Sequence, residues 1–320
     1  MINRRATLAL GAAAALGIGG LATWRTFESD LAKAQKRLAN RSQVIACRFG
    51  PLEYAIAGRG SPVLMVHGTG GGFDQGLTFA ERLVGMGYQV IAPSRFGYLR
   101  SAMPHDPSSD NQADAFADLL DTLQIDSIPV LGGSAGALSA IAFAIRHPER
   151  CSALGALVPA TFVPGRPPVR PAPLSMAIIE YGLRSDFLYW SATKLAPQSM
   201  TTALLATDPE VVERADATEQ ARVRRILWEI FPVSARANGL LNDAKLAGTP
   251  AEQPLARITA PTLAISLEDD RFGTFEAAKH IAASVRGARL VTWPQGGHVW
   301  VGHDAQMFAE IDTFLRASRL

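Results

Sequence analysis

The stretch Gly132-Gly133-Ser134-Ala135-Gly136 decides how the rest of this chain is interpreted. An apolar run, Ile128 to Leu131, precedes it, and a helix-prone segment of small and apolar residues follows as far as His147. This order predicts a strand, a sharp turn and a helix, with one serine at the turn. Small residues beside the serine suit a turn too tight for bulky side chains. Such a turn exposes the serine hydroxyl, which makes Ser134 a candidate nucleophile.

The composition is that of a globular protein with a large core. With 320 residues, of which 48% are hydrophobic and 19% charged, the chain fits one enlarged α/β domain or two small ones. A net charge of +2, without a basic cluster interleaved with aromatic residues, argues against a nucleic-acid partner. The two cysteines, Cys47 and Cys151, lack metal-ligand spacing, so we expect free thiols. Nothing in the sequence specifies an oligomeric state.

The N-terminal segment differs in character from the rest. Arg4 and Arg5 precede an uncharged run, Ala6 to Trp24, which Arg25 closes. A basic region before an apolar one predicts, for residues 1–24, a signal peptide or an N-terminal membrane anchor. The run is rich in Ala and Gly, so its insertion as a spanning helix would be marginal and an export signal is favoured. We therefore expect export to the periplasm or exterior, or tethering to the membrane through residues 6–24, followed by a helical connector at 25–42.

From residue 43 the periodicity becomes that of an α/β protein. Short apolar strands alternate with helix-prone stretches, which predicts a mostly parallel sheet covered by helices on both faces. The core is expected to comprise residues 43–159 and 254–320. Ligands in such sheets bind beyond the carboxyl ends of the strands, so the loops there should contain the chemistry. The expected strands are Val44–Phe49, Glu53–Ala57, Val63–Val66, Gln89–Ala92, Ile128–Leu131, Ala153–Val158, Pro261–Ser266 and Ala288–Trp293.

The first of these loops is His67-Gly68-Thr69-Gly70-Gly71-Gly72. Its glycines let the backbone approach a ligand with N–H groups pointing inward, as an oxyanion hole requires. His67 is expected to stabilise the turn rather than act as a base. The next loop, Ser94 to Ser101, could also line the site, with Phe96 as a candidate pocket residue, although Arg95 suits a structural ion pair.

A serine nucleophile needs a base, and the base needs a carboxylate. His298 lies in a glycine-flanked loop just after an expected strand, and His303 is its nearby competitor. The carboxylate should follow the strand that ends at Ser266. The adjacent residues Asp269 and Asp270 both qualify, and Glu268 is the third choice.

Residues 160–253 read as a helical lid inserted into the core. The segment opens with several prolines, which predicts a rigid exit from the sheet, and then becomes helix-prone and rich in apolar and aromatic residues. Most of these should pack the lid against the core. The remainder, with Trp190 and Trp228 as candidates, should form an apolar pocket above Ser134. That pocket would suit a hydrophobic acyl or aromatic group.

From about Gly50 onward the chain resembles the α/β-hydrolase superfamily, in the branch with a separate lid. The resemblance is carried by His67-Gly68-Thr69-Gly70, the Gly132–Gly136 turn, Asp270-Arg271 and Gly296-Gly297-His298, in that chain order. It implies an α/β-hydrolase fold and a Ser134–His298–Asp270 triad, because the family's acid usually precedes Arg or Pro. It also implies an oxyanion hole formed by the N–H of Ala135 and one from Thr69 or Gly70, and chemistry that needs no metal or organic cofactor.

The expected function is that of an esterase-like serine hydrolase. It would cleave a carboxylic ester or lactone with an apolar acyl or aromatic part through an acyl-enzyme. One alternative is hydrolysis of carbon–carbon bonds in vinylogous diketones, because related lidded enzymes use the same triad. The other is a catalytically silent protein that keeps the fold and binds an apolar ligand.

Overall fold

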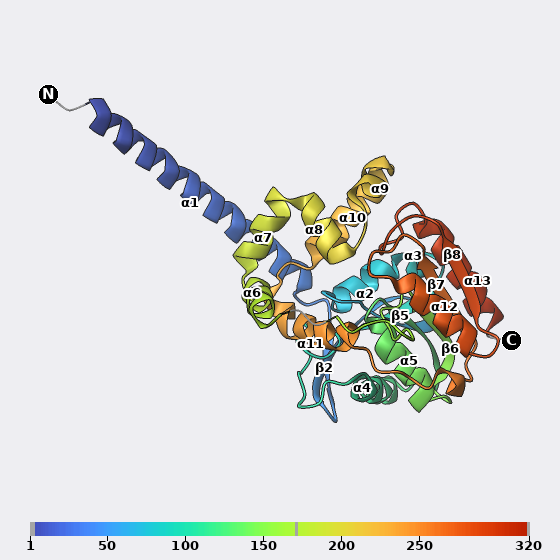
Figure 1. Ribbon diagram of the computed structural model, residues 1–320. Helices are drawn as coiled ribbons and strands as arrows, with labels where there is room; N and C mark the ends of the chain where they lie inside the picture. The colour runs from blue at the N-terminus through green and yellow to red at the C-terminus, as the bar shows by residue number, and fades with distance from the viewer. Residues whose placement is uncertain (1–3, 170–171, 319–320) are drawn as a thin grey trace.

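Eight strands form one sheet in the computed structural model, which describes residues 4–169 and 172–318 (Figure 1). Their spatial order is β1-β2-β4-β3-β5-β6-β7-β8. The β1–β2 and β2–β4 pairs are antiparallel and the others are parallel. Every expected strand overlaps an observed one, so the predicted mostly parallel sheet is confirmed. The strands are β1 (Gln43–Cys47), β2 (Gly50–Gly58), β3 (Ser61–Val66), β4 (Tyr88–Pro93), β5 (Ile128–Gly133), β6 (Cys151–Leu157), β7 (Thr262–Leu267) and β8 (Arg289–Trp293).

The central strands are apolar throughout because helices cover both faces of the sheet. All six residues of β7 are buried. One core cluster joins the sheet to α4, α5 and α12, and a second joins it to α2, α3 and α13. These helices are α2 (Phe73–Phe79), α3 (Glu81–Gly85), α4 (Ser109–Thr122), α5 (Gly136–Arg146), α12 (Thr274–Ser284) and α13 (Asp304–Ala317).

Between β6 and β7 the chain leaves the sheet and forms a helical insertion, here defined as α6 to α11. Ser185, Asp208 and Asp216 begin α7, α9 and α10, and each side chain accepts a backbone N–H of the first turn. The helices of the insertion are α6 (Pro173–Leu183), α7 (Asp186–Leu195), α8 (Pro197–Leu205), α9 (Pro209–Arg214), α10 (Ala217–Glu229) and α11 (Ala237–Gly248), and the 3₁₀ turns η1 (Ser234–Arg236) and η2 (Leu255–Arg257) lie before and after α11.

One long helix, α1 (Arg4–Leu38), precedes the sheet and extends away from it (Figure 1). It runs through both the expected signal or anchor segment and the expected connector. Its second half packs against the insertion, where Phe27 contacts Trp190 and Phe231. Among the residues that the structure describes, no helix combines the length and hydropathy needed to cross a membrane.

Candidate active site

Ser134 occupies the turn between β5 and α5 in a conformation that side chains rarely adopt. Its φ is +52°, in the left-handed region. Glycine is required on both sides of Ser134 because neighbouring atoms lie too close to leave room for a Cβ. A Cβ on Gly136 would lie 2.4 Å from the His67 carbonyl oxygen, and one on Gly132 would lie 2.7 Å from the Cβ of Ala140. The small residues of the motif thus let strand and helix meet at the turn that presents Ser134.

Three loops from distant parts of the chain bring Ser134, His298 and Asp270 together. Ser134 Oγ lies 2.9 Å from His298 Nε2, and His298 Nδ1 lies 2.7 Å from Asp270 Oδ2. All three residues are buried. If Nδ1 holds the ring proton and donates it to Asp270, the lone pair of Nε2 can accept the serine O–H. The arrangement can therefore raise the nucleophilicity of the serine oxygen.

The environment of Asp270 keeps its carboxylate ionised. Burial alone would raise its pKa, but the His298 side chain and hydrogen bonds from Thr274 and the Phe272 N–H outweigh it, and the pKa lies below its usual value. Thr274 Oγ1 is in turn in hydrogen-bond contact with Ser266. These supporting hydroxyls have no sequence motif and were not foreseen.

Asp269, the other candidate acid, points elsewhere. Its carboxylate accepts the N–H of Gly296 at 3.1 Å and of Gly297 at 2.8 Å. It thereby ties the loop after β7 to the loop that presents His298. His303, the competing histidine, hydrogen-bonds Gln306 and stacks on Trp293. The structure thus places Asp270 and His298, rather than their neighbours, against Ser134.

The backbone N–H groups of the glycine-rich loop after β3 differ in whether they have an acceptor. Gly70 N donates to the Tyr98 hydroxyl at 3.1 Å, so this N–H is already engaged. Within residues 4–169 and 172–318, no acceptor takes the N–H of Thr69 or of Ala135. Ala135 lies at the N-terminus of α5, where backbone N–H groups have no partner within the helix. Of the two alternatives, Thr69 therefore suits an oxyanion contact better than Gly70.

His67 stabilises the glycine-rich loop, as its position in the sequence predicts. Its Nδ1 lies 2.7 Å from the Gly68 carbonyl oxygen, and its Nε2 accepts the Arg95 N–H at 2.9 Å. Burial, reinforced by the Arg95 guanidinium, holds the pKa of His67 well below its usual value. The neutral ring therefore serves as a fixed bridge. Arg95 itself forms a buried, bidentate ion pair with Asp243.

Of the three predicted pocket residues, Trp190 and Trp228 lie near each other, both beside the Lys194 ammonium, and Phe96 belongs to a different core cluster. Phe96 is buried in the core and packs edge-on against Phe49. Trp190 packs against Phe27 of α1 and donates its indole N–H to Asp30. The ring of Trp228 lies under the Lys194 ammonium, 4.8 Å away. Trp190 is engaged this way because α1 docks on the insertion, a contact that composition does not reveal.

Other apolar residues lie next to the catalytic candidates instead. Phe272 packs edge-on against the His298 ring, with centroids 4.8 Å apart, and is half-exposed. The Ile230 side chain covers Gly70, since a Cβ there would lie 3.3 Å from it. Thr207 covers Gly297 in the same way, at 2.5 Å. These residues come from the insertion and from the loop after Asp270, and no motif marks them.

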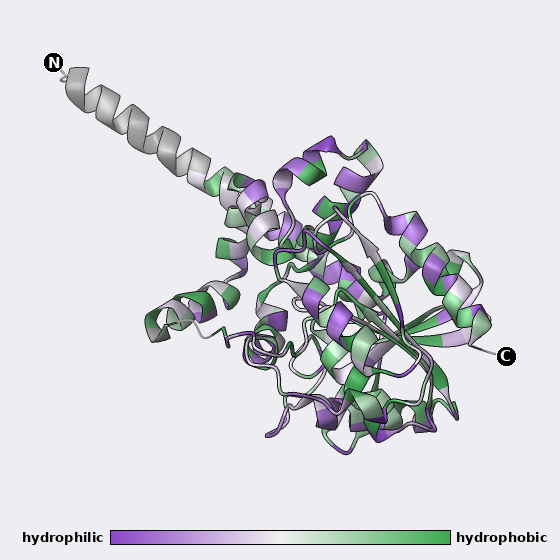
Figure 2. Cartoon of the chain, turned by 45° about the vertical axis from the view of Figure 1, so that its right-hand side comes forward, coloured by the Kyte–Doolittle hydropathy of each residue, from purple (hydrophilic) through white to green (hydrophobic). Residues whose placement is uncertain are grey.

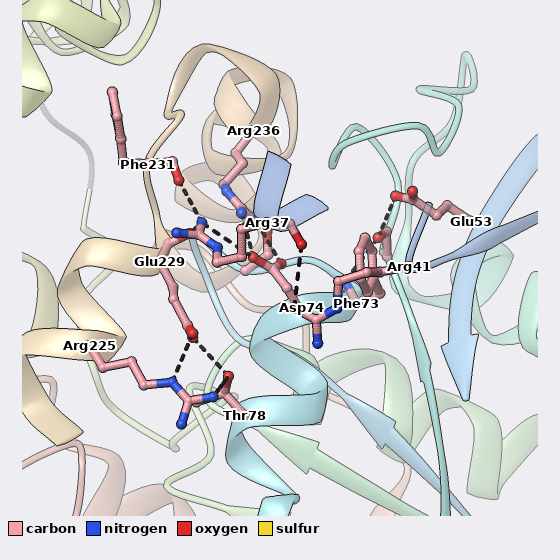
Figure 3. A network of polar contacts seen from close by, with 12 residues as sticks. Arg37, Arg41, Glu53, Phe73, Asp74, Thr78, Arg225, Glu229, Phe231 and Arg236 are labelled. Atoms are coloured by element: carbon pink, nitrogen blue, oxygen red, sulfur yellow. Dashed lines mark hydrogen bonds and ion pairs between the residues drawn. The ribbon is translucent and has the colours of Figure 1, made fainter. Parts of the chain in front are cut away.

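A buried charge network fastens α1 and the insertion to the glycine-rich loop (Figure 3). Arg236, fully buried, pairs with Asp74 at 2.8 Å and donates to the Gly71 carbonyl. Arg37 of α1 lies 3.6 Å from the same Asp74 carboxylate and donates to the Phe231 carbonyl at 2.6 Å. One aspartate at the start of α2 thus joins three elements beside the site.

No group of three or more His, Cys, Asp and Glu side chains is placed to bind a metal ion within the described part of the chain.

Comparisons with known proteins show the family to which the chain belongs. A family model described as the alpha/beta hydrolase fold matches residues 61–301. "Uncharacterized hydrolase YcgS" of Bacillus subtilis is 27% identical over 282 residues, covering 84% of this chain and 95% of the relative. The "2-hydroxy-6-oxononadienedioate/2-hydroxy-6-oxononatrienedioate hydrolase 2" of Pseudomonas putida is 30% identical over 279 residues, 81% of this chain and 91% of the relative. An alpha/beta hydrolase fold protein from Nakamurella multipartita has a TM-score of 0.69 at 28% identity, over 86% of this chain and 99% of that one.

Proposed function

Because the chain belongs to the α/β-hydrolase family, we propose that it is a serine hydrolase with Ser134 as nucleophile. The observation that supports this most is the continuous contact from Ser134 Oγ to His298 Nε2 at 2.9 Å and from His298 Nδ1 to Asp270 at 2.7 Å. The proposed substrate is a carboxylic ester or lactone with an apolar acyl or aromatic part.

In the first half-reaction, Ser134 Oγ attacks the substrate carbonyl while His298 Nε2 takes the hydroxyl proton. The imidazole becomes cationic, and the ionised Asp270 stabilises it through Nδ1. The tetrahedral intermediate collapses when His298 returns the proton to the leaving alcohol oxygen. The product of this step is an acyl-enzyme ester at Ser134, and the alcohol is released from an ester but stays attached to the acyl group of a lactone.

In the second half-reaction, His298 takes a proton from water, and the resulting hydroxide attacks the acyl carbonyl. His298 then protonates Ser134 Oγ, and the carboxylic acid departs. In both steps the N–H groups of Thr69 and Ala135 would hold the oxyanion, since neither has an acceptor among the described residues. Removing one such donor from related sites typically costs about 10²–10³ in kcat.

The apolar side chains beside the candidates support an apolar substrate group. Phe272 and Ile230 adjoin the His298 ring and the glycine-rich loop, respectively. Among the described residues, the buried arginines next to that loop, Arg95 and Arg236, each pair with an aspartate. Neither is free to bind a substrate carboxylate, which favours a neutral ester over a dicarboxylate.

Carbon–carbon bond hydrolysis is the second candidate. It is favoured by the Pseudomonas putida relative, whose name specifies a 2-hydroxy-6-oxo-diene dicarboxylate. The keto tautomer of such a compound is a vinylogous diketone, which the same triad could cleave with a carbanion equivalent as leaving group. The paired arginines weigh against a diketone that carries carboxylates, and not against a diketone without a carboxyl group.

The N-terminal pattern leads to a proposal about location. Arg4 and Arg5 followed by the uncharged run to Trp24 suit export, or tethering at a membrane. Expression with a C-terminal tag, followed by fractionation and mass measurement of the mature N-terminus, tests both. Recovery of the full-length chain in the cytosolic fraction alone would reject both.

A fluorophosphonate probe tests the enzyme assignment, because it labels only an activated serine. The purified chain should gain the mass of one probe, and Ser134→Ala should gain none while unfolding at a similar temperature. A panel of aryl esters, lactones and diketones then separates the two reaction classes. A well-folded wild type that resists the probe and cleaves nothing in the panel would indicate a silent binding protein instead.

A further inference from the structure

The helical insertion leaves an unusual amount of apolar surface uncovered. On α6, the side chains of Leu174, Ile178 and Tyr181 are 75%, 64% and 72% exposed, and Leu195 at the end of α7 is 85% exposed. Figure 2 shows hydrophobic residues, in green, along α6. Soluble monomers rarely leave large apolar side chains clustered in this way, and such patches mark interaction sites. We call this surface the apolar rim; it comprises Leu21, Trp24, Leu174, Ile178, Ile179, Tyr181, Leu188 and Leu195.

The three helices that carry the rim contact one another. The ring of Trp24 on α1 lies 5.7 Å from that of Phe187 on α7, and α6 packs against α7. Leu21 and Trp24 are both about half-exposed, so α1 extends the apolar surface of the insertion toward its own N-terminus. Figure 1 shows α6, α7 and the emerging α1 on the same side of the molecule, away from β8.

The sequence of α1 points to what covers the rim. Its residues Ala6 to Trp24 include no charged residue, over about 28 Å of helix at 1.5 Å per residue. Arg4, Arg5 and Arg25 flank that run. A long uncharged helix with cationic ends suits lipid chains beside anionic headgroups better than a soluble protein surface. Trp24 and Tyr181 are of the residue types that favour the membrane–water interface.

We propose that the apolar rim docks on the surface of a bilayer that contains anionic lipid. The part of α1 around Leu21 and Trp24 and the exposed face of α6 contact the same membrane. This docking goes beyond the proposed function and does not require turnover at Ser134. Arg37 joins α1 to Asp74 beside the glycine-rich loop, so the ion pair connects the docked helix directly to the site.

The test is flotation of the full-length chain with phosphatidylcholine vesicles that contain about 30% phosphatidylglycerol. The anionic headgroups of phosphatidylglycerol attract cationic side chains near the membrane surface. The Ser134→Ala variant is used so that hydrolysis cannot alter the vesicles. It should float with the vesicles, and less so with phosphatidylcholine alone. The double substitution Ile178→Glu and Tyr181→Glu should lower the bound fraction at least tenfold. The double substitution Ile178→Ser and Tyr181→Ser should also lower the bound fraction. Because serine adds no charge, this result would show that loss of apolar contact is sufficient to weaken binding.

Leu290→Glu and Val44→Glu are the matched controls, since both residues are exposed and apolar but lie on β8 and β1 at the two edges of the sheet. They should bind as the parent does. Absence of binding by the parent, or equal binding by parent and rim variants, would overturn the proposal. So would a dimer in light scattering that the rim substitutions dissociate, because a second copy would then cover the rim. Failure of the fluorophosphonate test would leave the docking result unaffected.

Discussion

Asp269 and Asp270 are adjacent and chemically identical, yet their surroundings give them different tasks. Asp270 contacts the His298 ring, whereas Asp269 accepts two backbone N–H groups of the loop that carries that ring. Both follow from where the chain turns after β7. The sequence narrowed the acid to this pair. It could not choose between them by chemistry, because a one-residue shift in the loop would exchange their positions.

Substitution of the two aspartates by asparagine should therefore have different effects on kcat and on the loop. Asp270→Asn leaves the ring without an ionised partner, and kcat should fall by about 10⁴. In Asp269→Asn, the amide oxygen can still accept one backbone N–H but the other hydrogen bond is lost, which loosens the loop. We therefore expect kcat to fall about 10- to 100-fold with little change in KM. Hydrogen exchange at residues 296–298 should rise for Asp269→Asn, and exposed Glu268→Gln is the control. A larger loss from Asp269→Asn would exchange the two assignments.

His67 makes the stability of the chain depend on pH. Burial depresses its folded-state pKa, whereas the unfolded chain has the ordinary value of about 6.5. Above that pH both states hold a neutral ring. As the pH falls below it, the unfolded chain binds a proton that the folded chain excludes. The free energy of unfolding should then fall by up to about 1.4 kcal/mol per pH unit until the folded pKa is reached.

Urea denaturation between pH 7.5 and 5 measures this slope. Substitution of exposed His105 by Gln should preserve it, and His67→Gln, though less stable at pH 7.5, should flatten it. An unchanged slope in His67→Gln would assign the acid sensitivity to other groups.

At the scale of elements, the strands were predictable and the docking of helices was not. Strands such as β3 and β7 are apolar because both faces are buried, and that run is visible in the sequence. By contrast, a change of composition at Arg25 suggested a boundary, and one helix passes through it. The second half is distinguished by its contacts with the insertion, which are the packing of Phe27 and the polar contacts of Asp30 and Arg37. Trp190 was misplaced for the same reason, because its partner lies 163 residues away in sequence on α1.

Arg37 should be the residue that holds α1 to the insertion. Its guanidinium donates to the carbonyls of Glu229 and Phe231, so Arg37→Met removes two charge-assisted hydrogen bonds, each worth about 1.5–3 kcal/mol. Hydrogen exchange should increase at residues 229–236, and limited proteolysis should cut α1 sooner. Lys36→Met, at an exposed position of the same helix, should change neither. Equal protection from hydrogen exchange in the wild type and in Arg37→Met would mean that apolar packing alone holds α1 against the insertion.

At the scale of the whole molecule, the site follows from the parallel sheet. Ser134 follows β5, Asp270 follows β7 and His298 follows β8, so their loops emerge at one edge of the sheet. That convergence depends on strand direction alone, which is why the three residues could be chosen before their contacts were known. The residues that cover them come from the insertion and from the loop after Asp270, whose paths no periodicity specifies.

The rim and the site together predict that the turnover rate depends on whether the substrate lies in a membrane or in solution. An ester with a long acyl chain partitions into vesicles, and a chain docked through α1 and α6 would meet it there at high local concentration. Wild-type turnover of such an ester should rise several-fold when anionic vesicles are added, whereas turnover of a short, soluble ester should not. The Ile178→Glu and Tyr181→Glu variant should match the wild type on the soluble ester and lose the acceleration, because the substitutions lie on an exposed face of α6. Leu290→Glu should keep it. An acceleration that survives in the rim variant would show that vesicles act on the substrate alone, by dispersing it.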